Sequence, residues 1–203
     1  MIFSTMAKPR IYLAGPDVFA PNRDEIFARL RAACASAGLE GMAPCDGGQS
    51  RFVSPQEQAR WIYDENIRLL KECDGVIANL NGFRGVEPDS GTSFEVGFAA
   101  AMGKPVALVI ESESSWEERV TQAFGSEKKK DGDYDQTHGA MIEAFELPAN
   151  LMLAFGSCVW ARNPEAAARE LSKQFGKGAE DNPAMRHLQA SHRTGAVEMK
   201  AGS

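Results

Sequence analysis

Short apolar segments alternate along this chain with longer segments of helical periodicity, and this alternation constrains the fold more than any other feature. The apolar segments lie at residues 10–16, 41–44, 75–80, 106–110 and 157–160. Helical segments follow them at residues 22–37, 55–73, 91–103 and 163–175. Uninterrupted apolar runs are typical of parallel strands buried on both faces. The alternation therefore predicts an α/β fold, a parallel sheet with helices on both faces and right-handed crossovers.

One domain of ordinary size accounts for most of the 203 residues. Residues 10–176 form the predicted α/β domain, and residues 1–9 precede it as an N-terminal extension. Residues 111–147 are strongly charged and long for one connection, which indicates a lid or an insertion. Residues 177–203 are polar and aperiodic, so we expect a disordered tail.

Charge and composition exclude several classes of function. The net charge of −6 argues against a nucleic acid or an anionic membrane as partner, because both bind basic surfaces. No apolar run is long enough to cross a membrane or to act as a signal peptide, so we expect a cytoplasmic location. The four cysteines and three histidines show no metal-ligand spacing. We expect buried free thiols and no metal site.

Two carboxylates, Asp89 and Glu95, flank a Ser-Gly-Thr turn where a helix should begin. We expect Glu95 in the first helical turn, where the helix dipole favours its anionic form. A solvent-facing acidic residue is the alternative. Ser90 or Thr92 can cap this helix, which would leave Asp89 free to face a ligand, although a cap or turn role for Asp89 is equally compatible. Paired carboxylates in one cleft are what cleavage of a glycosidic bond requires.

Three further side chains are candidates for the site, and the position of Asn66 is the least expected of them. Tyr12 and Phe19 bracket the loop after the first strand, and Asn66 interrupts an apolar helical face. Aromatic residues at a strand end are usually core residues, but a phenol there could also steady a carboxylate across the cleft. A surface amide is the ordinary interpretation of Asn66. Ligands of such sheets bind beyond the carboxyl ends of the strands, so the loop that holds Phe19 is a candidate binding loop.

Four segments resemble, in consistent order, the motifs of the nucleoside 2-deoxyribosyltransferases. These segments are residues 11–19, 66–74, 83–97 and 150–152, and they span roughly residues 10–175. The resemblance implies a flavodoxin-like, doubly wound fold with a five-stranded parallel sheet and helices on both faces. It also implies that neither a metal nor an organic cofactor is needed.

The resemblance implies a role for each matching residue. Glu95 would be the nucleophile, Tyr12 would orient it, and Asp89 would bind the nucleoside and assist the leaving base. The implied substrate-binding residues are Gly15, Phe19, Asn66, Gly91, Asn150 and Met152. Some family members carry an aspartate at the position of Asn66, but a subgroup with the Phe-Arg-Gly and Glu-Pro-Asp signature carries asparagine, and this chain resembles that subgroup. Asn66 would therefore hydrogen-bond the nucleoside rather than donate a proton. Asn150 and Met152 would complete the site of a neighbouring subunit, which implies a homo-oligomer.

The implied reaction moves 2-deoxyribose between purine or pyrimidine bases through a covalent glutamyl-deoxyribose intermediate with net retention. Its substrates would be 2′-deoxyribonucleosides and free nucleobases, with side hydrolysis where water replaces the second base. Two alternatives stay open at this point. One is an N-glycosidase acting on deoxyribonucleoside 5′-monophosphates, and the other is a module that senses a nucleotide without turnover.

Overall fold

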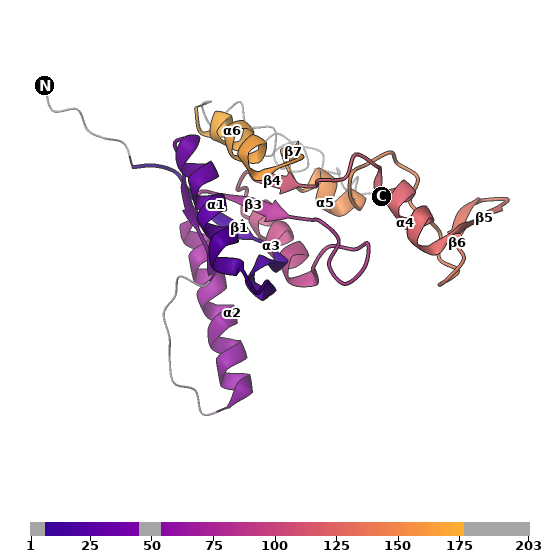
Figure 1. The fold of residues 1–203 in the computed structure, drawn as a ribbon, viewed down its shortest axis with the longest axis horizontal. Helices are drawn as coiled ribbons and strands as arrows, with labels where there is room; N and C mark the ends of the chain where they lie inside the picture. The colour runs from indigo at the N-terminus through magenta and orange to yellow at the C-terminus, as the bar shows by residue number, and fades with distance from the viewer. Residues whose placement is uncertain (1–6, 45–53, 177–203) are drawn as a thin grey trace, which may run out of the picture.

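A five-stranded parallel sheet lies at the centre of the computed structural model, which describes residues 7–44 and 54–176. Its strand order is β2-β1-β3-β4-β7 (Figure 1), which confirms the predicted fold class. The strands are β1 (Arg10–Ala14), β2 (Glu40–Met42), β3 (Gly75–Asn79), β4 (Val106–Val109) and β7 (Val159–Ala161). The chain leaves β1 on one side toward β2 and returns on the other side to β3. The strand order therefore reverses at β1 and β3, which is where ligands bind in such sheets.

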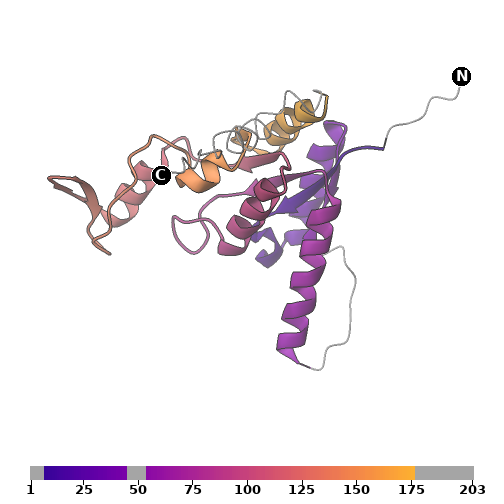
Figure 2. The same ribbon diagram turned by 180° about the vertical axis from the view of Figure 1, so that it is seen from behind.

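Two pairs of helices cover the two faces of this sheet (Figures 1 and 2). Helices α2 (Pro55–Glu72) and α3 (Ser90–Ala101) pack on one face, against the strand residues Tyr12, Val76 and Leu108. Helices α1 (Arg23–Ser36) and α6 (Pro164–Phe175) pack on the other, against Ile11 and Ile77. Successive residues of a strand point to opposite faces, so each of the central strands β1, β3 and β4 contributes to both cores.

The ends of the helices follow from local sequence. Ser54 accepts a hydrogen bond from the backbone of Glu57, and the Glu57 side chain accepts one from the backbone of Ser54, which makes a capping box for α2. Asn163 caps α6 by accepting from the Ala166 backbone N–H at 2.8 Å, and Pro164 occupies the first helical position. The predicted helix start at Asn163 is thus confirmed.

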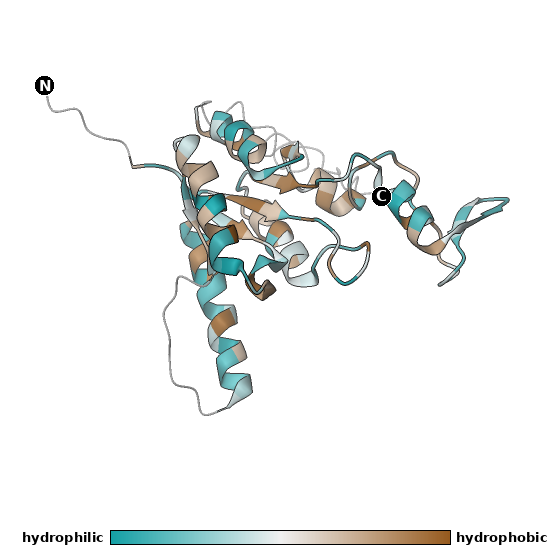
Figure 3. Cartoon of the chain, in the orientation of Figure 1, coloured by the Kyte–Doolittle hydropathy of each residue, from teal (hydrophilic) through white to brown (hydrophobic). Residues whose placement is uncertain are grey.

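The segment after β4 forms an arm that extends away from the sheet (Figures 1 and 2). The arm contains α4 (Trp116–Phe124) and an antiparallel hairpin of β5 (Ser126–Lys129) and β6 (Gly132–Asp135), and the chain then returns through the short helix α5 (Leu151–Phe155), which packs beside α3. In Figure 3 the hairpin is mostly hydrophilic, in contrast to the apolar central strands of the sheet. The sequence indicated an insertion here but not the hairpin, because its strands lack an apolar face.

Two predictions about the rest of the chain concern residues outside the described part, namely the tail at 177–203 and residues 1–6 of the N-terminal extension. Within the described ranges, no helix is both long and apolar enough to pass through a membrane. Cys34 and Cys73 are buried free thiols, as predicted, and Cys158 is a free thiol that is partly buried. Cys45 lies outside the described residues.

Candidate active site

The fold brings together Tyr12 and Glu95, which are 83 positions apart in the sequence. Tyr12 lies in β1 with its side chain fully buried, and its hydroxyl donates a hydrogen bond to Oε1 of Glu95 at 2.5 Å. Glu95 lies in α3, which packs on the face of the sheet to which Tyr12 points. A rigid strand and a packed helix therefore hold this carboxylate in one orientation.

Burial raises the pKa of Glu95 to about 7, the hydrogen bond from Tyr12 opposes this rise, and the negative charge of Asp89 adds to it. Burial together with the charge of Glu95 also raises the pKa of Tyr12 well above its usual range, so the phenol stays a donor. A carboxyl group with a pKa near 7 is partly ionised at neutral pH and can act as a nucleophile or exchange a proton.

Asp89 is the N-cap of α3, so of the two alternatives that the sequence left open, a cap role for Asp89 holds and capping by Ser90 or Thr92 does not. Its Oδ2 accepts hydrogen bonds from the backbone N–H of Thr92 at 2.8 Å and from the Thr92 hydroxyl at 3.0 Å. The helix begins at Ser90, so Thr92 is the third helical residue and its N–H points back to the cap. The cap thus orients the carboxylate of Asp89 at the entrance of the helix.

The same helix start places Glu95 in the second turn of α3 rather than in the predicted first turn. The effect of the helix dipole falls off within the first turn, so it favours the anion of Glu95 less than the sequence suggested. Burial dominates instead, and the pKa of Glu95 is raised rather than lowered.

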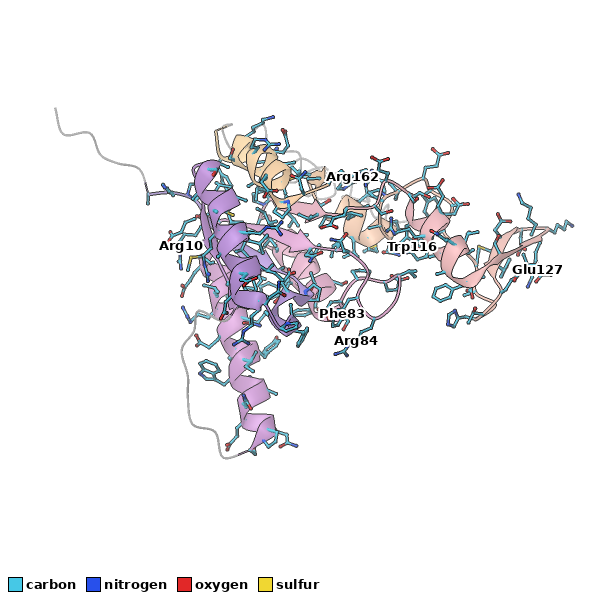
Figure 4. The ribbon with its side chains drawn as sticks, in the orientation of Figure 1. Arg10, Phe83, Arg84, Trp116, Glu127 and Arg162 are labelled. Atoms are coloured by element: carbon cyan, nitrogen blue, oxygen red, sulfur yellow. The ribbon has the colours of Figure 1, made fainter. Side chains whose placement is uncertain are left out.

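Phe19 and Phe83 form an aromatic pair at the carboxyl edge of the sheet. Phe19 ends the short 3₁₀ helix η1 (Pro16–Phe19) and is 63% exposed, and its ring stacks on Phe83 with centroids 5.6 Å apart and planes 19° apart. The Arg84 guanidinium lies 4.7 Å from the centre of the Phe83 ring. Figure 4 shows Phe83 and Arg84 next to each other in the loop after β3. This stack offers a flat surface to a planar ligand.

Phe83 was not among the predicted site residues, although it begins the segment 83–97 that resembles the family. The loops after β1 and β3 become neighbours only through the reversal of strand order at β1. Phe83 could be identified as a site residue only from the fact that β1 and β3 are neighbours in the sheet. The sequence alone does not give this strand order.

The remaining predicted residues surround the start of α3. Asn66 is partly buried on α2 one turn after Tyr63, whose ring lies 6.3 Å from that of Phe94 on α3, so this side of α2 faces α3. A Cβ on Gly91 would lie 3.0 Å from Oδ2 of Asp89. A Cβ on Gly15 would lie 2.5 Å from Oδ2 of Asp17, so a side chain there would displace this carboxylate.

Asn150 and Met152 begin α5, beside the start of α3. Oδ1 of Asn150 accepts from the Met152 N–H at 3.0 Å, and the amide of Asn150 donates to Oε1 of Glu143 at 2.9 Å. Met152 is 74% exposed. Both residues line a cavity of about 420 Å³ together with residues of the same chain, namely Glu87, Pro88, Ser90, Ser93, Trp116 and Leu153.

No group of three His, Cys, Asp or Glu side chains could hold a metal ion within residues 7–44 and 54–176. The candidate site is thus built from one buried carboxyl–phenol pair, one capping carboxylate and one aromatic stack.

Comparisons with known proteins agree with this architecture. A family model described as nucleoside 2-deoxyribosyltransferase matches residues 11–152. An uncharacterized protein of Schizosaccharomyces pombe is 33% identical over 157 residues, which are 71% of this chain and 74% of that protein. The structure of a 2-desoxiribosyltransferase from Leishmania mexicana is 32% identical with a TM-score of 0.63, covering 81% of this chain and 97% of that one. A conserved protein from Enterococcus faecalis shares the fold at 17% identity, with a TM-score of 0.54 over 82% of this chain and 99% of that one.

Proposed function

This chain belongs to the nucleoside 2-deoxyribosyltransferase family, and we propose that it transfers 2-deoxyribose between nucleobases through a covalent bond to Glu95. The observation that carries the proposal is the hydrogen bond of 2.5 Å between the Tyr12 hydroxyl and Oε1 of Glu95. It engages one carboxylate oxygen and leaves Oε2 to attack the sugar. The pKa of Glu95, about 7, supplies a substantial ionised fraction at neutral pH.

The reaction proceeds in two displacements at the anomeric carbon. Oε2 of ionised Glu95 attacks C1′ as the glycosidic C–N bond breaks, and the electron pair of that bond leaves with the base nitrogen. Asp89, at the entrance of α3, binds the nucleoside and assists the protonation of the leaving base. A nitrogen of a second base then attacks C1′ and displaces Glu95, so two inversions give net retention. Water in place of the second base would give side hydrolysis.

The selectivity for 2-deoxy sugars follows from the transition state. Positive charge develops on the sugar ring as the base departs, and a 2-hydroxyl withdraws electron density and raises the energy of that cation. Around the sugar and the base, the proposed binding residues are Gly15, Phe19, Asn66 and Gly91. The exposed Phe19 ring, stacked on Phe83, supplies the flat surface on which a nucleobase can pack.

We further propose that the enzyme is a homo-oligomer in which Asn150 and Met152 complete the site of a neighbouring subunit. Met152 and Phe155 are 74% and 73% exposed, so α5 presents two large apolar side chains to solvent. Burial of such side chains favours association with another surface.

Two of the three hydroxyl groups of Ser90, Thr92 and Ser93 at the start of α3 are already engaged, which favours an unphosphorylated substrate over a 5′-monophosphate. The Thr92 hydroxyl donates to Oδ2 of Asp89, and the Ser93 hydroxyl donates to the Asp89 carbonyl at 3.0 Å. Neither donor is therefore left for a phosphate. The carboxylate of Glu87 lines the adjoining cavity and would repel an anion.

Base exchange tests the proposal directly. Deoxyinosine or thymidine is incubated with free adenine, and deoxyadenosine is followed by chromatography, with ribonucleosides as controls. We expect deoxyadenosine from the wild-type enzyme and none from Glu95→Ala. A slow fluorinated deoxynucleoside should leave its sugar on the peptide that contains Glu95.

Three outcomes would point elsewhere. Faster base release from deoxyinosine monophosphate than from deoxyinosine would indicate the N-glycosidase. Saturable binding of nucleosides with no exchange and no base release would indicate a sensing module. A labelled peptide that lacks Glu95 would remove this residue from the role of nucleophile.

A further inference from the structure

A chain of side-chain hydrogen bonds connects the carboxyl ends of β1, β3 and β4. Nδ2 of Asn79 donates to both carboxylate oxygens of Asp17, at 3.1 and 3.2 Å. Oδ1 of Asn79 accepts from the backbone N–H and the amide of Asn81, at 3.1 and 2.8 Å. Oδ1 of Asn81 accepts from the Glu111 N–H at 2.9 Å. We call this set the Asp17–Asn79–Asn81 network.

Asn79 donates hydrogen bonds on one side of the network and accepts them on the other. Its amide N–H₂ faces a carboxylate, which can only accept, and its carbonyl faces an amide and a backbone N–H, which donate. Gly15 makes room for this arrangement, since a Cβ there would lie 2.5 Å from Oδ2 of Asp17 and 3.0 Å from Cβ of Asn79. Sequence and geometry therefore specify each partner.

The network lies on the face of the sheet opposite to Glu95. Asn79 follows Ile77 by two positions in β3, and Ile77 packs in the core beneath α1 and α6. Asp17, Asn79 and Asn81 line a cavity of about 200 Å³ on that side, together with Ile26 and Leu30 of α1. Tyr12, which holds Glu95, belongs to the other core. The network thus acts on loops rather than on the nucleophile.

Each end of the network lies two positions before a ring of the aromatic pair. Asp17 and Phe19 share η1, and Asn81 precedes Phe83 in the loop after β3. From this geometry we infer that Asp17 and Asn79 are positioning residues, which fix the spacing of Phe19 and Phe83 so that the pair can receive a nucleobase. The inference rests on the proposed function, in which Phe19 packs against the base.

Swapping the side chains of Asp17 and Asn79 distinguishes a positioning role from a general contribution to stability. Asn79→Asp alone sets two carboxylates against each other and removes the donor between them. The double variant Asp17→Asn with Asn79→Asp reverses the pair: the new amide at position 17 donates to the new carboxylate, whose other oxygen still accepts from Asn81. The matched control is Arg29→Gln, which changes a charge in the same cavity and removes none of the network's bonds.

In base exchange, we expect Asn79→Asp to raise KM for adenine about tenfold with kcat within about twofold, because a displaced stack weakens binding more than chemistry. The reversed pair should return KM to within about twofold of wild type, and Arg29→Gln should leave it unchanged. If Asn79→Asp does not fold, Asp17→Asn takes its place, since an amide oxygen can still accept one bond from Asn79. That variant should raise KM about threefold.

Hydrogen exchange of peptides covering residues 15–20 and 80–86 gives a readout that needs no activity. We expect faster exchange in both peptides for Asn79→Asp and recovery in the reversed pair. Unchanged KM despite faster exchange, or no recovery of KM in the reversed pair, would overturn the positioning role and leave the proposed transfer intact. A wild-type enzyme that exchanges no bases would instead overturn the proposed function.

Discussion

At the scale of single residues, the ionisation of Glu95 connects structure with activity. Its pKa is about 7 because burial disfavours the carboxylate. A nucleophile must be ionised, so we expect kcat/KM to rise with pH up to about 7 and then level off. Tyr12→Phe removes the hydrogen bond that lowers this pKa, so the rise should move to higher pH. The measurement is a pH profile of kcat/KM for both enzymes.

In the same pH profile, Asp89→Asn should shift the rise in kcat/KM in the opposite direction. The negative charge of Asp89 raises the pKa of Glu95, so its removal should move the rise in kcat/KM to lower pH, whatever happens to the maximal rate. A wild-type profile that levels off near pH 4.5, the ordinary value for a glutamate, would contradict this account of Glu95.

The same pKa makes a prediction about stability. The pKa of Glu95 is higher in the folded protein than its ordinary value of 4.5, so between pH 4.5 and about 7 the folded state binds more protons than the unfolded state. The contribution of Glu95 to the free energy of unfolding should therefore fall as pH rises through this window, by at most about 3 kcal/mol. Glu95→Gln cannot titrate and should flatten the curve. Urea unfolding of both proteins from pH 4.5 to 7.5 measures the difference.

The sequence predicted Glu95 and Tyr12 as site residues, but it predicted neither the pKa of Glu95 nor the role of Asn79. Glu95 and Tyr12 follow from motifs that lie in single short segments, and the fold then places their side chains 2.5 Å apart. The pKa of Glu95 could not be predicted in the same way, because it depends on burial by elements distant in the sequence. Asn79 looked like the end of an apolar strand, since the carboxylate that it binds comes from another loop.

At the scale of elements, the start of α3 combines stability with function in one side chain. Asp89 caps this helix through Oδ2. Asp89→Ala should lower the free energy of unfolding by about 1 kcal/mol, because two donors of Thr92 lose their acceptor. Asp89→Asn keeps an oxygen acceptor and should stay close to wild type.

Activity separates the two roles of Asp89. Both variants should transfer deoxyribose more slowly than wild type, since neither carries the carboxylate that assists the leaving base. Urea unfolding and base-exchange rates, measured on the same preparations, test the pair. A fully active Asp89→Asn with a destabilised Asp89→Ala would reduce Asp89 to a helix cap.

Periodicity located the strands of the central sheet and the four helices that cover it, because each of these elements buries an apolar face. The predicted helix at 22–37 corresponds to α1 (Arg23–Ser36), and the predicted strand at 106–110 corresponds to β4 (Val106–Val109). The hairpin of β5 and β6 has no such face: three of the four residues of β5 are exposed. Its stability comes from pairing between strands and from contacts within the arm, which composition does not reveal.

At the scale of the whole molecule, the reversal of strand order at β1 brings the loops after β1 and β3 together. The sequence predicts the parallel sheet, because helices that alternate with strands act as crossovers that bring each strand back in the same direction. It does not predict how the site divides between the two faces of the sheet. Glu95 belongs to α3 on one face, whereas the network behind the aromatic pair lies on the other face, toward α1.

The proposal that two subunits share each site can be tested by combining two inactive variants in one oligomer. Asn150 lies at the start of α5, beside a cavity that also reaches Ser90 and Ser93 of its own chain, so action within one chain and action across an interface are both geometrically open. Glu95→Gln and Asn150→Ala are co-expressed with different affinity tags, and the mixed oligomer is purified through both tags. Each variant alone should be nearly inactive.

If Asn150 acts across the interface, a mixed dimer holds one complete site, formed by Glu95 of the Asn150→Ala chain and Asn150 of the Glu95→Gln chain. Such a dimer should show about half of the wild-type rate of base exchange, because the symmetric interface provides two sites and only one is intact. If Asn150 acts within its own chain, neither site is complete and the rate does not exceed that of the Asn150→Ala parent. Sedimentation of the mixed preparation establishes that dimers are present, so a low rate in such dimers would mean that each chain builds its site alone.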